Sequence, residues 1–196
     1  MNKKRDSLAP NYFESLYADD PDPWRFASSA YERNKYETTL AALSGHQFQS
    51  AFEVGCSVGI LTRQLAQVCK SLLAIDVAER ALGQARATCE SMNNVKFARM
   101  HIPWEWPEND FDLIVLSEVL YYFCLDDVSR IAQKTIASLV PRGVVLLVHW
   151  TGATDYPCQG DQAVECYLAA GGQWLSPQFS RREPKYRLDL LIRSST

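Results

Sequence analysis

The sequence predicts a single α/β domain built on a doubly wound, mostly parallel β-sheet with helices on both faces. Three observations lead to this fold class. Short, nearly continuous apolar runs alternate with segments of helical periodicity, a loop of small residues follows the first run, and two closely spaced extended segments end the chain. Apolar runs that alternate with helical patterns are typical of βαβ units.

The apolar runs are predicted to be central strands, because strands covered by helices on both faces are apolar along most of their length. They are Ala51-Phe52-Glu53-Val54, Leu72-Leu73-Ala74-Ile75, Phe111-Asp112-Leu113-Ile114-Val115-Leu116 and Val144-Val145-Leu146-Leu147-Val148. The helices between them are predicted from apolar spacing. One begins at Asp126-Asp127, where acidic residues suit the helix dipole, and continues to Leu139. A second helix is predicted from Val77 to Met92, and a third is predicted to begin near Ile60.

The two ends of the chain differ from this central part, residues 46–150. Residues 1–45 hold two helical candidates, Leu8 to Tyr17 and Ala30 to Leu43, which we expect to form a lid over the sheet edge. Residues 151–196 hold a helical segment from Gln162 to Ala170, followed by extended segments from Gln173 to Phe179 and from Tyr186 to Ile192. Strands this close in sequence pair only antiparallel.

Composition excludes several functional classes. The chain of 196 residues is 47% hydrophobic, and its longest strongly apolar stretches, such as Gly143 to Val148, are far shorter than the roughly 20 residues of a membrane-spanning helix. A net charge of −3, with basic clusters only at Lys3-Lys4-Arg5 and around Arg181 to Arg187, does not indicate nucleic-acid binding. Neither the length nor the charge of the chain indicates an oligomeric state.

The N-terminus and the cysteines indicate the compartment. The basic start is followed by Leu8-Ala9-Pro10-Asn11 rather than by the apolar segment of a signal peptide. The six cysteines form no Cys-x-x-Cys pair and mostly occupy apolar patterns. We therefore expect reduced thiols, no metal site and a cytoplasmic protein.

The loop Gly55-Cys56-Ser57-Val58-Gly59 lies between the first strand and a helix, where ligands bind in open α/β sheets. Glycines permit positive φ, and the helix N-terminus offers free N–H groups. Asp76 ends the second strand, where a carboxylate accepts hydrogen bonds from the ribose hydroxyls of a nucleoside. The alternative for Asp76 is a cap for the following helix. Ser57 departs from the Gly-x-Gly-x-x-Gly pattern of nicotinamide enzymes.

The pattern Glu53-x-Gly55-x-Ser57-x-Gly59, with Asp76 and Phe111-Asp112-Leu113-Ile114, resembles the class I S-adenosylmethionine-dependent methyltransferases. The resemblance implies a Rossmann-like seven-stranded sheet with an antiparallel last strand. It also implies a cofactor site for S-adenosylmethionine, which leaves as S-adenosylhomocysteine. The residues implied for this site are Glu53, Gly55, Cys56, Ser57, Gly59, Asp76, Val77, Ser117 and, at the end of a third strand, Met100, His101 and Ile102. The alternative for His101 is a surface loop residue.

Further blocks narrow the resemblance to the nodulation N-methyltransferases over essentially the whole chain. These blocks are Asp22-Pro23-Trp24-Arg25-Phe26, Tyr31-Glu32-Arg33-Asn34-Lys35-Tyr36, Phe52 to Ser57 and Ser117-Glu118-Val119-Leu120-Tyr121-Tyr122. This resemblance implies methylation of the free amine on the non-reducing-end glucosamine of a deacetylated chitooligosaccharide.

Methylation of an amine needs alignment of donor and acceptor and an outlet for the proton. The candidates at strand ends are Glu118 and His149, with Tyr121 or Tyr122 positioning the nitrogen, and Asp155 as a weaker candidate. Alternatively, Glu118 is a salt-bridged carboxylate at the start of a short helix, and His149 is a packed side chain. Amino sugars are partly neutral near pH 7, so a dedicated base is not required.

Aromatic side chains offer flat faces for a sugar, and Trp104, Trp106, Trp150 and Tyr156 lie in loops predicted to surround the active end; the alternative for each is a core position. Trp24 and Arg33 are expected to close over the cofactor, with Arg33 pairing the methionine carboxylate or a neighbouring helix residue.

Three other functions compete with methylation of an amino sugar. They are a methyltransferase for another small acceptor, a non-catalytic S-adenosylmethionine-binding domain and a nicotinamide oxidoreductase.

Overall fold

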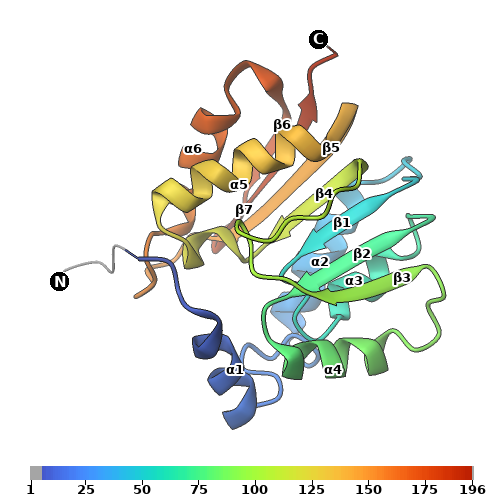
Figure 1. Cartoon of the computed structure of the whole chain (residues 1–196), viewed down its shortest axis with the longest axis vertical. Coiled ribbons are helices and arrows are strands. Elements are labelled where there is room, and N and C mark those ends of the chain that lie inside the picture. The colour runs from blue at the N-terminus through green and yellow to red at the C-terminus, as the bar shows by residue number, and fades with distance from the viewer. Residues whose placement is uncertain (1–5, 196) are drawn as a thin grey trace. The chain divides into compact units, whose positions relative to one another are not determined.

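The computed structural model describes residues 6–195, so the basic Lys3-Lys4-Arg5 lies outside the described residues. Seven strands form one sheet in the order β3-β2-β1-β4-β5-β7-β6 (Figure 1). The pairs β1–β2, β2–β3 and β4–β5 are parallel, whereas β7 is antiparallel to both β5 and β6. The predicted mostly parallel sheet with an antiparallel last strand is therefore confirmed.

The chain divides into two compact units, of which the first to be described is Ala9–His101. It holds the strands β1 (Ala51–Val54), β2 (Leu72–Asp76) and β3 (Val95–Arg99) and the helices α1 (Pro10–Asp19), α2 (Ala30–Ala42), α3 (Ile60–Leu65) and α4 (Glu79–Thr88). Helix α4 contacts β2, β3, α3 and α1, so that α1 is anchored on α4 at the lower end of Figure 1.

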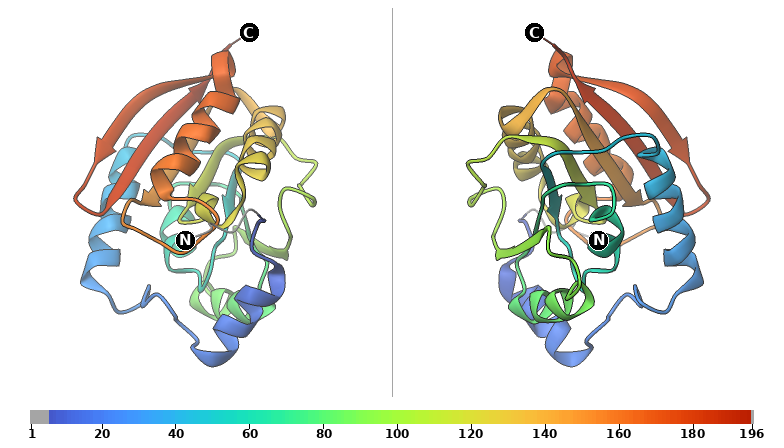
Figure 2. Two further views of the ribbon diagram at one scale, coloured as in Figure 1. Left: turned by 90° about the vertical axis from the view of Figure 1, so that its left-hand side faces the viewer. Right: turned by 90° about the vertical axis from the view of Figure 1, so that its right-hand side faces the viewer.

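The second unit contains the remaining described residues, 6–8 and 102–195. Its strands are β4 (Phe111–Ser117), β5 (Leu139–Trp150), β6 (Leu175–Arg182) and β7 (Tyr186–Arg193). Its helices are α5 (Leu125–Ser138) and α6 (Gly160–Gly171), with the 3-10 turns η1 (Leu120–Tyr122) and η2 (Gly172–Trp174). Figure 2 shows α5 and α6 side by side, with the β6–β7 hairpin beyond α6.

The core explains why the apolar runs became strands. Strand β1 is buried at every position, and β4 and β5 are buried over Leu113 to Leu116 and Val144 to His149. Helix α5 buries the predicted stripe, including Val128, Ile131 and Ala132, and has Asp126 and Asp127 in its first turn. Burial of this apolar surface is the main term that stabilises the fold.

Several predicted elements differ in their bounds, and α4 and β6 show why. Helix α4 is shorter than Val77 to Met92, because the Asp76 carboxylate accepts a hydrogen bond from the Ala78 N–H and keeps Ala78 extended, while a tight turn from Cys89 to Met92 ends it. The segment predicted to be extended from Gln173 begins with the turn η2, since Gly172 has a φ of +48°. Strand β6 therefore starts at Leu175.

Candidate functional site

The loop between β1 and α3, residues 55–59, is held in a conformation that depends on small residues. Gly55, Ser57 and Gly59 all have positive φ, of 75°, 50° and 83°. The N–H groups of Gly55 and Cys56 both donate to the Ile75 carbonyl at 2.8 Å. A Cβ at Gly59 would lie 2.9 Å from the Ala85 Cα, so glycine lets α3 begin directly against α4.

Asp76 connects this loop to the start of α4. One carboxylate oxygen accepts from the Ser57 N–H and the other from the Ala78 N–H, each at 2.9 Å. Burial raises the pKa of Asp76, although these backbone donors oppose the shift. The hydrogen bond to the Ala78 N–H fixes the turn before α4, whose start has no side-chain cap. It leaves room for a ribose role as well, since each carboxylate oxygen accepts more than one hydrogen bond.

Ser57 contacts a residue that sequence reasoning did not connect to the site. Its Oγ lies 2.5 Å from the hydroxyl of Tyr17, which is buried on α1. Burial and the nearby Asp76 raise the pKa of Tyr17, so its hydroxyl stays protonated. The Ser57 side chain therefore links the loop to α1. The predicted helix at Leu8 to Tyr17 was the only sequence signal for this contact.

Aromatic and small apolar residues cover the loop. Val58 and Ala78 form a buried cluster with Tyr17 and Ala81, and Trp24 packs against that cluster. The Trp24 ring stacks on Phe26 with 5.6 Å between centroids and meets Tyr17 edge-on at 5.7 Å. This places Trp24 beside the predicted cofactor loop.

The remaining predicted cofactor residues divide between the two units. Val77 is half-buried after Asp76, and its carbonyl accepts from Arg99 Nε at 3.0 Å. The Met100 N–H donates to the Asp76 carbonyl at 3.1 Å. His101 is half-buried at the end of the first unit, whereas the buried Ile102 begins the second. Arg33 is exposed on α2 and donates to the Ser28 carbonyl at 3.2 Å.

Glu53 is a buried carboxylate at the end of β1. It is 2% exposed, and its Oε2 has no hydrogen-bond partner among the described residues. Burial, with a smaller effect from Asp76, raises its pKa from 4.5 to about 7. An unpartnered buried acceptor is costly unless something satisfies it, so Glu53 is suited to bind a ligand donor such as an ammonium group.

This pKa shift predicts a pH effect on stability. Because the folded state holds the Glu53 proton up to about pH 7 and the unfolded state loses it near pH 4.5, the contribution of Glu53 to the free energy of unfolding falls as pH rises through this range. We expect Glu53→Gln to gain stability over the native chain between pH 5 and 8, by up to about 3 kcal/mol. Urea denaturation at four pH values measures this, with Glu37→Gln, on the exposed side of α2, as the control. Parallel curves for Glu53→Gln and the native chain would contradict it.

In the second unit, Glu118 follows β4 in a left-handed conformation, with a φ of 56°. Its N–H donates to the Val148 carbonyl at 2.7 Å, and its Oε2 accepts from the Tyr121 hydroxyl and the Trp150 N–H, both at 2.8 Å. The carboxylate thus joins the ends of β4 and β5 to η1. Ser117, one residue earlier, pairs with Val148 in the sheet and is half-buried.

His149 is completely buried on β5. Its Nε2 accepts a hydrogen bond from the Leu120 N–H at 3.1 Å, and its ring meets Tyr121 edge-on at 5.9 Å between centroids. The nitrogen lone pair that a base would use is therefore engaged in holding η1. This placement agrees with the packed alternative.

Three tyrosines gather next to these two residues. The rings of Tyr121 and Tyr156 are stacked, 5.5 Å apart with 6° between their planes. Tyr122 meets each of them edge-on at 4.7 Å between centroids. Tyr121 and Tyr122 are buried, whereas Tyr156 is half-buried in the loop before α6.

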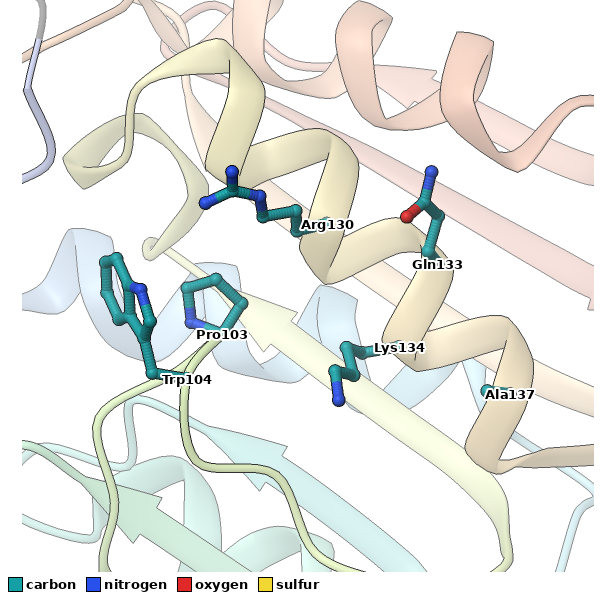
Figure 3. Close-up of a pocket in the computed structure, with 6 residues that line it drawn as sticks. All are labelled: Pro103, Trp104, Arg130, Gln133, Lys134 and Ala137. Carbon is teal, nitrogen blue, oxygen red and sulfur yellow. The ribbon is translucent and has the colours of Figure 1, made fainter.

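The tryptophans expected around the active end occupy different environments. Trp104 is exposed and lines a cavity of about 340 Å³ with Arg130 and Lys134 of α5 (Figure 3). Neither Glu118 nor a tyrosine lines this cavity. Trp106 donates from Nε1 to Ser138 Oγ at 3.0 Å. Lys185 lies 5.8 Å from the Trp150 ring centroid. Asp155 is exposed.

Two features of residues 6–195 bear on other functional classes. No helix there is both long and apolar enough to cross a membrane. No group of three or more His, Cys, Asp or Glu side chains is arranged to hold a metal ion in that part of the chain. All six cysteines lie within it, and none of them forms a disulfide.

The seven-stranded sheet with an antiparallel last strand, and the small-residue loop between β1 and α3, define a class I methyltransferase fold. The family model described as nodulation protein S (NodS) matches residues 13–150. The chain belongs to the NodS family.

Relatives of known sequence agree with this assignment. The chain is 35% identical over 126 residues to nodulation protein S of Sinorhizobium fredii, a match that covers 62% of the chain and 57% of the relative. It is 33% identical over 141 residues to nodulation protein S of Bradyrhizobium diazoefficiens, with 70% and 66% covered. The matches therefore span roughly three fifths of the length of these relatives.

Two solved structures share the fold. The N-methyltransferase NodS from Bradyrhizobium japonicum WM9 in complex with S-adenosyl-L-homocysteine has a TM-score of 0.79 and 24% identity, covering 93% of this chain and 97% of that one. A methyltransferase described as putative, from Pseudomonas syringae, has a TM-score of 0.73 and 32% identity, covering 84% and 100%.

Proposed function

We propose that the chain is an S-adenosylmethionine-dependent N-methyltransferase that methylates the free amine on the non-reducing-end glucosamine of a deacetylated chitooligosaccharide, a step in Nod factor synthesis. The observation that carries the donor half of this proposal is the loop between β1 and α3, with the buried carboxylates of Glu53 and Asp76 at the ends of β1 and β2. Membership of the NodS family supports the proposed identity of the acceptor.

The first unit fits the donor in three respects. The helix α3 begins at Ile60, directly after Gly59, and presents N–H groups beside the loop. The partnerless Oε2 of Glu53 suits the α-ammonium of the methionine part. Asp76 retains acceptor capacity for ribose hydroxyls, and Trp24 and Val77 supply apolar surface near it. When bound, S-adenosylmethionine supplies a methyl group on a positively charged sulfur.

The residues of the chain would act mainly by orientation. Alignment of two reactants and exclusion of water contribute about 7 kcal/mol or more to lowering a barrier. In the second unit, Ser117 and Glu118 end β4, and Glu118 and His149 fix η1 through hydrogen bonds to Tyr121 and Leu120. Tyr122 packs within the same tyrosine cluster. We propose that these residues order the acceptor side, and that water takes the amine proton.

A cytoplasmic location and the lack of a nucleic-acid partner belong to the same proposal. The acceptor is a small polar molecule, and the chain has a net charge of −3 rather than a basic surface.

Calorimetric titration with S-adenosylmethionine, S-adenosylhomocysteine and NAD tests the donor half. We expect both sulfur compounds to bind and NAD to show no saturable binding. Saturable binding of NAD without binding of S-adenosylmethionine would favour an oxidoreductase and would overturn the proposal.

A further inference from the structure

The tyrosine cluster of the second unit points to a binding site for the acceptor sugar. Resting on the proposed function, we infer that the Tyr156 ring is the platform on which a pyranose ring of the acceptor lies. We further infer that Glu118 is a positioning residue, which holds this platform through Tyr121. Glu118 then shapes acceptor affinity and does not carry the amine proton.

The geometry of Tyr156 suits such a platform. One face of its ring rests on the buried Tyr121 ring, with the two planes 6° from parallel, and Tyr122 contacts it edge-on. Tyr156 nevertheless remains partly exposed to solvent. A tyrosine that is supported on one face and open to solvent offers an amphipathic flat surface, and the C–H face of a pyranose matches such a surface.

Hydrogen bonds hold the supporting ring. Tyr121 donates to Glu118 Oε2 at 2.8 Å, and burial raises the pKa of the Tyr121 phenol, so it remains a donor at neutral pH. The same oxygen accepts from the Trp150 N–H at 2.8 Å. Two donors to one carboxylate oxygen hold the Glu118 side chain between η1 and the end of β5. This arrangement suits an anchor for the supporting ring.

The loop that carries Tyr156 is itself braced. The Gln159 side chain accepts from the Thr154 N–H at 3.0 Å and donates to the Thr154 carbonyl at 2.8 Å, which closes the loop around Tyr156. Gly160 follows, where an added Cβ would lie 1.9 Å from the Trp150 carbonyl oxygen. A surface that is ordered before binding loses less conformational entropy when the ligand arrives.

Variants of Tyr156 test the platform in the full chain. With a deacetylated chitotetraose as acceptor, we expect Tyr156→Ala to raise the acceptor KM at least tenfold, while kcat changes less than about threefold. Tyr156→Phe keeps the ring and is expected to raise KM less than about twofold. Phe179→Ala, which removes an exposed aromatic side chain from β6, is the matched control and should leave KM unchanged. An unchanged KM in Tyr156→Ala would overturn the platform.

Variants of Glu118 test the positioning role. Glu118→Ala removes the carboxylate that accepts both hydrogen bonds and should raise the KM for the sugar at least fivefold. Tyr121→Phe removes one of these bonds and should raise this KM by a smaller factor. Glu118→Gln keeps an acceptor oxygen and should recover most of the lost affinity, with the pH profile of kcat unchanged. A large fall in kcat for Glu118→Gln, together with loss of the acidic limb of that profile, would show that Glu118 is the base and overturn this part.

A binding measurement separates this inference from the proposed reaction. Saturation-transfer NMR reports contact of the chitotetraose with the native chain and with Tyr156→Ala, whether or not turnover occurs. Contact that is lost in Tyr156→Ala supports the platform even if no methyl group is transferred. Methyl transfer by the native chain with equal contact in both proteins would retain the proposed function and reject the platform. Absence of contact with the native chain would reject it too.

Discussion

Asp76→Ala is expected to weaken the binding of S-adenosylmethionine at least tenfold. The substitution removes the carboxylate proposed to bind the ribose, and it also leaves the N–H groups of Ser57 and Ala78 without their acceptor. A buried donor that loses its partner costs about 1 to 3 kcal/mol, so the loop should lose order as well as a contact. Calorimetric titration gives the dissociation constant, and thermal unfolding gives the stability.

Asp76→Asn separates the two effects, because its amide oxygen keeps one backbone donor satisfied. Its affinity should fall between those of the native chain and Asp76→Ala. Asp110→Ala, at an exposed loop carboxylate, is the matched control and should bind normally. If Asp76→Ala binds as tightly as the native chain, the ribose assignment is wrong.

Gly59→Ala is expected to destabilise the fold by at least about 2 kcal/mol and to abolish cofactor binding. Alanine at this position would hold a φ of +83° at a cost of roughly 1 to 2 kcal/mol. Its Cβ would also lie 2.9 Å from the Ala85 Cα, a backbone atom that moves only if α4 moves. Chemical denaturation measures the loss.

Gly83 provides the matched control. It lies inside α4, an added Cβ meets nothing within 4 Å, and its φ is not positive. Gly83→Ala should therefore stabilise the protein by about 0.5 to 1 kcal/mol, because alanine is the better helix former. Equal stabilities of Gly59→Ala and Gly83→Ala would show that the loop does not depend on the close approach to α4.

The sequence predicted the elements whose signals are local. Strand β1 has the predicted bounds, Ala51–Val54, because a strand buried on both faces is marked by its own composition. Positive φ at Gly55 and Gly59 follows from their place between a strand and a helix. The ends of α4 were missed because a side chain, Asp76, and a turn at Cys89 determine them rather than the apolar spacing.

Contacts between distant residues could not be predicted in this way. Nothing in the periodicity of α1 indicates that Tyr17 reaches Ser57, forty residues later. Likewise, Glu118 and His149 were recognised as polar residues at strand ends, but their hydrogen bonds to Tyr121, Trp150 and Leu120 depend on how the chain folds back. The class of site was therefore predictable from local sequence, whereas the division of roles within it required side-chain geometry.

We propose that the protein transfers one methyl group to an amino sugar. Incubation of the purified protein with S-adenosylmethionine and a deacetylated chitooligosaccharide, followed by tandem mass spectrometry, detects this transfer. We expect the gain of one methyl mass on the amine of the non-reducing-end residue, with S-adenosylhomocysteine as the other product, and no gain when that amine is acetylated. Tight binding of the donor with no methyl gain on the sugar would contradict the proposed acceptor.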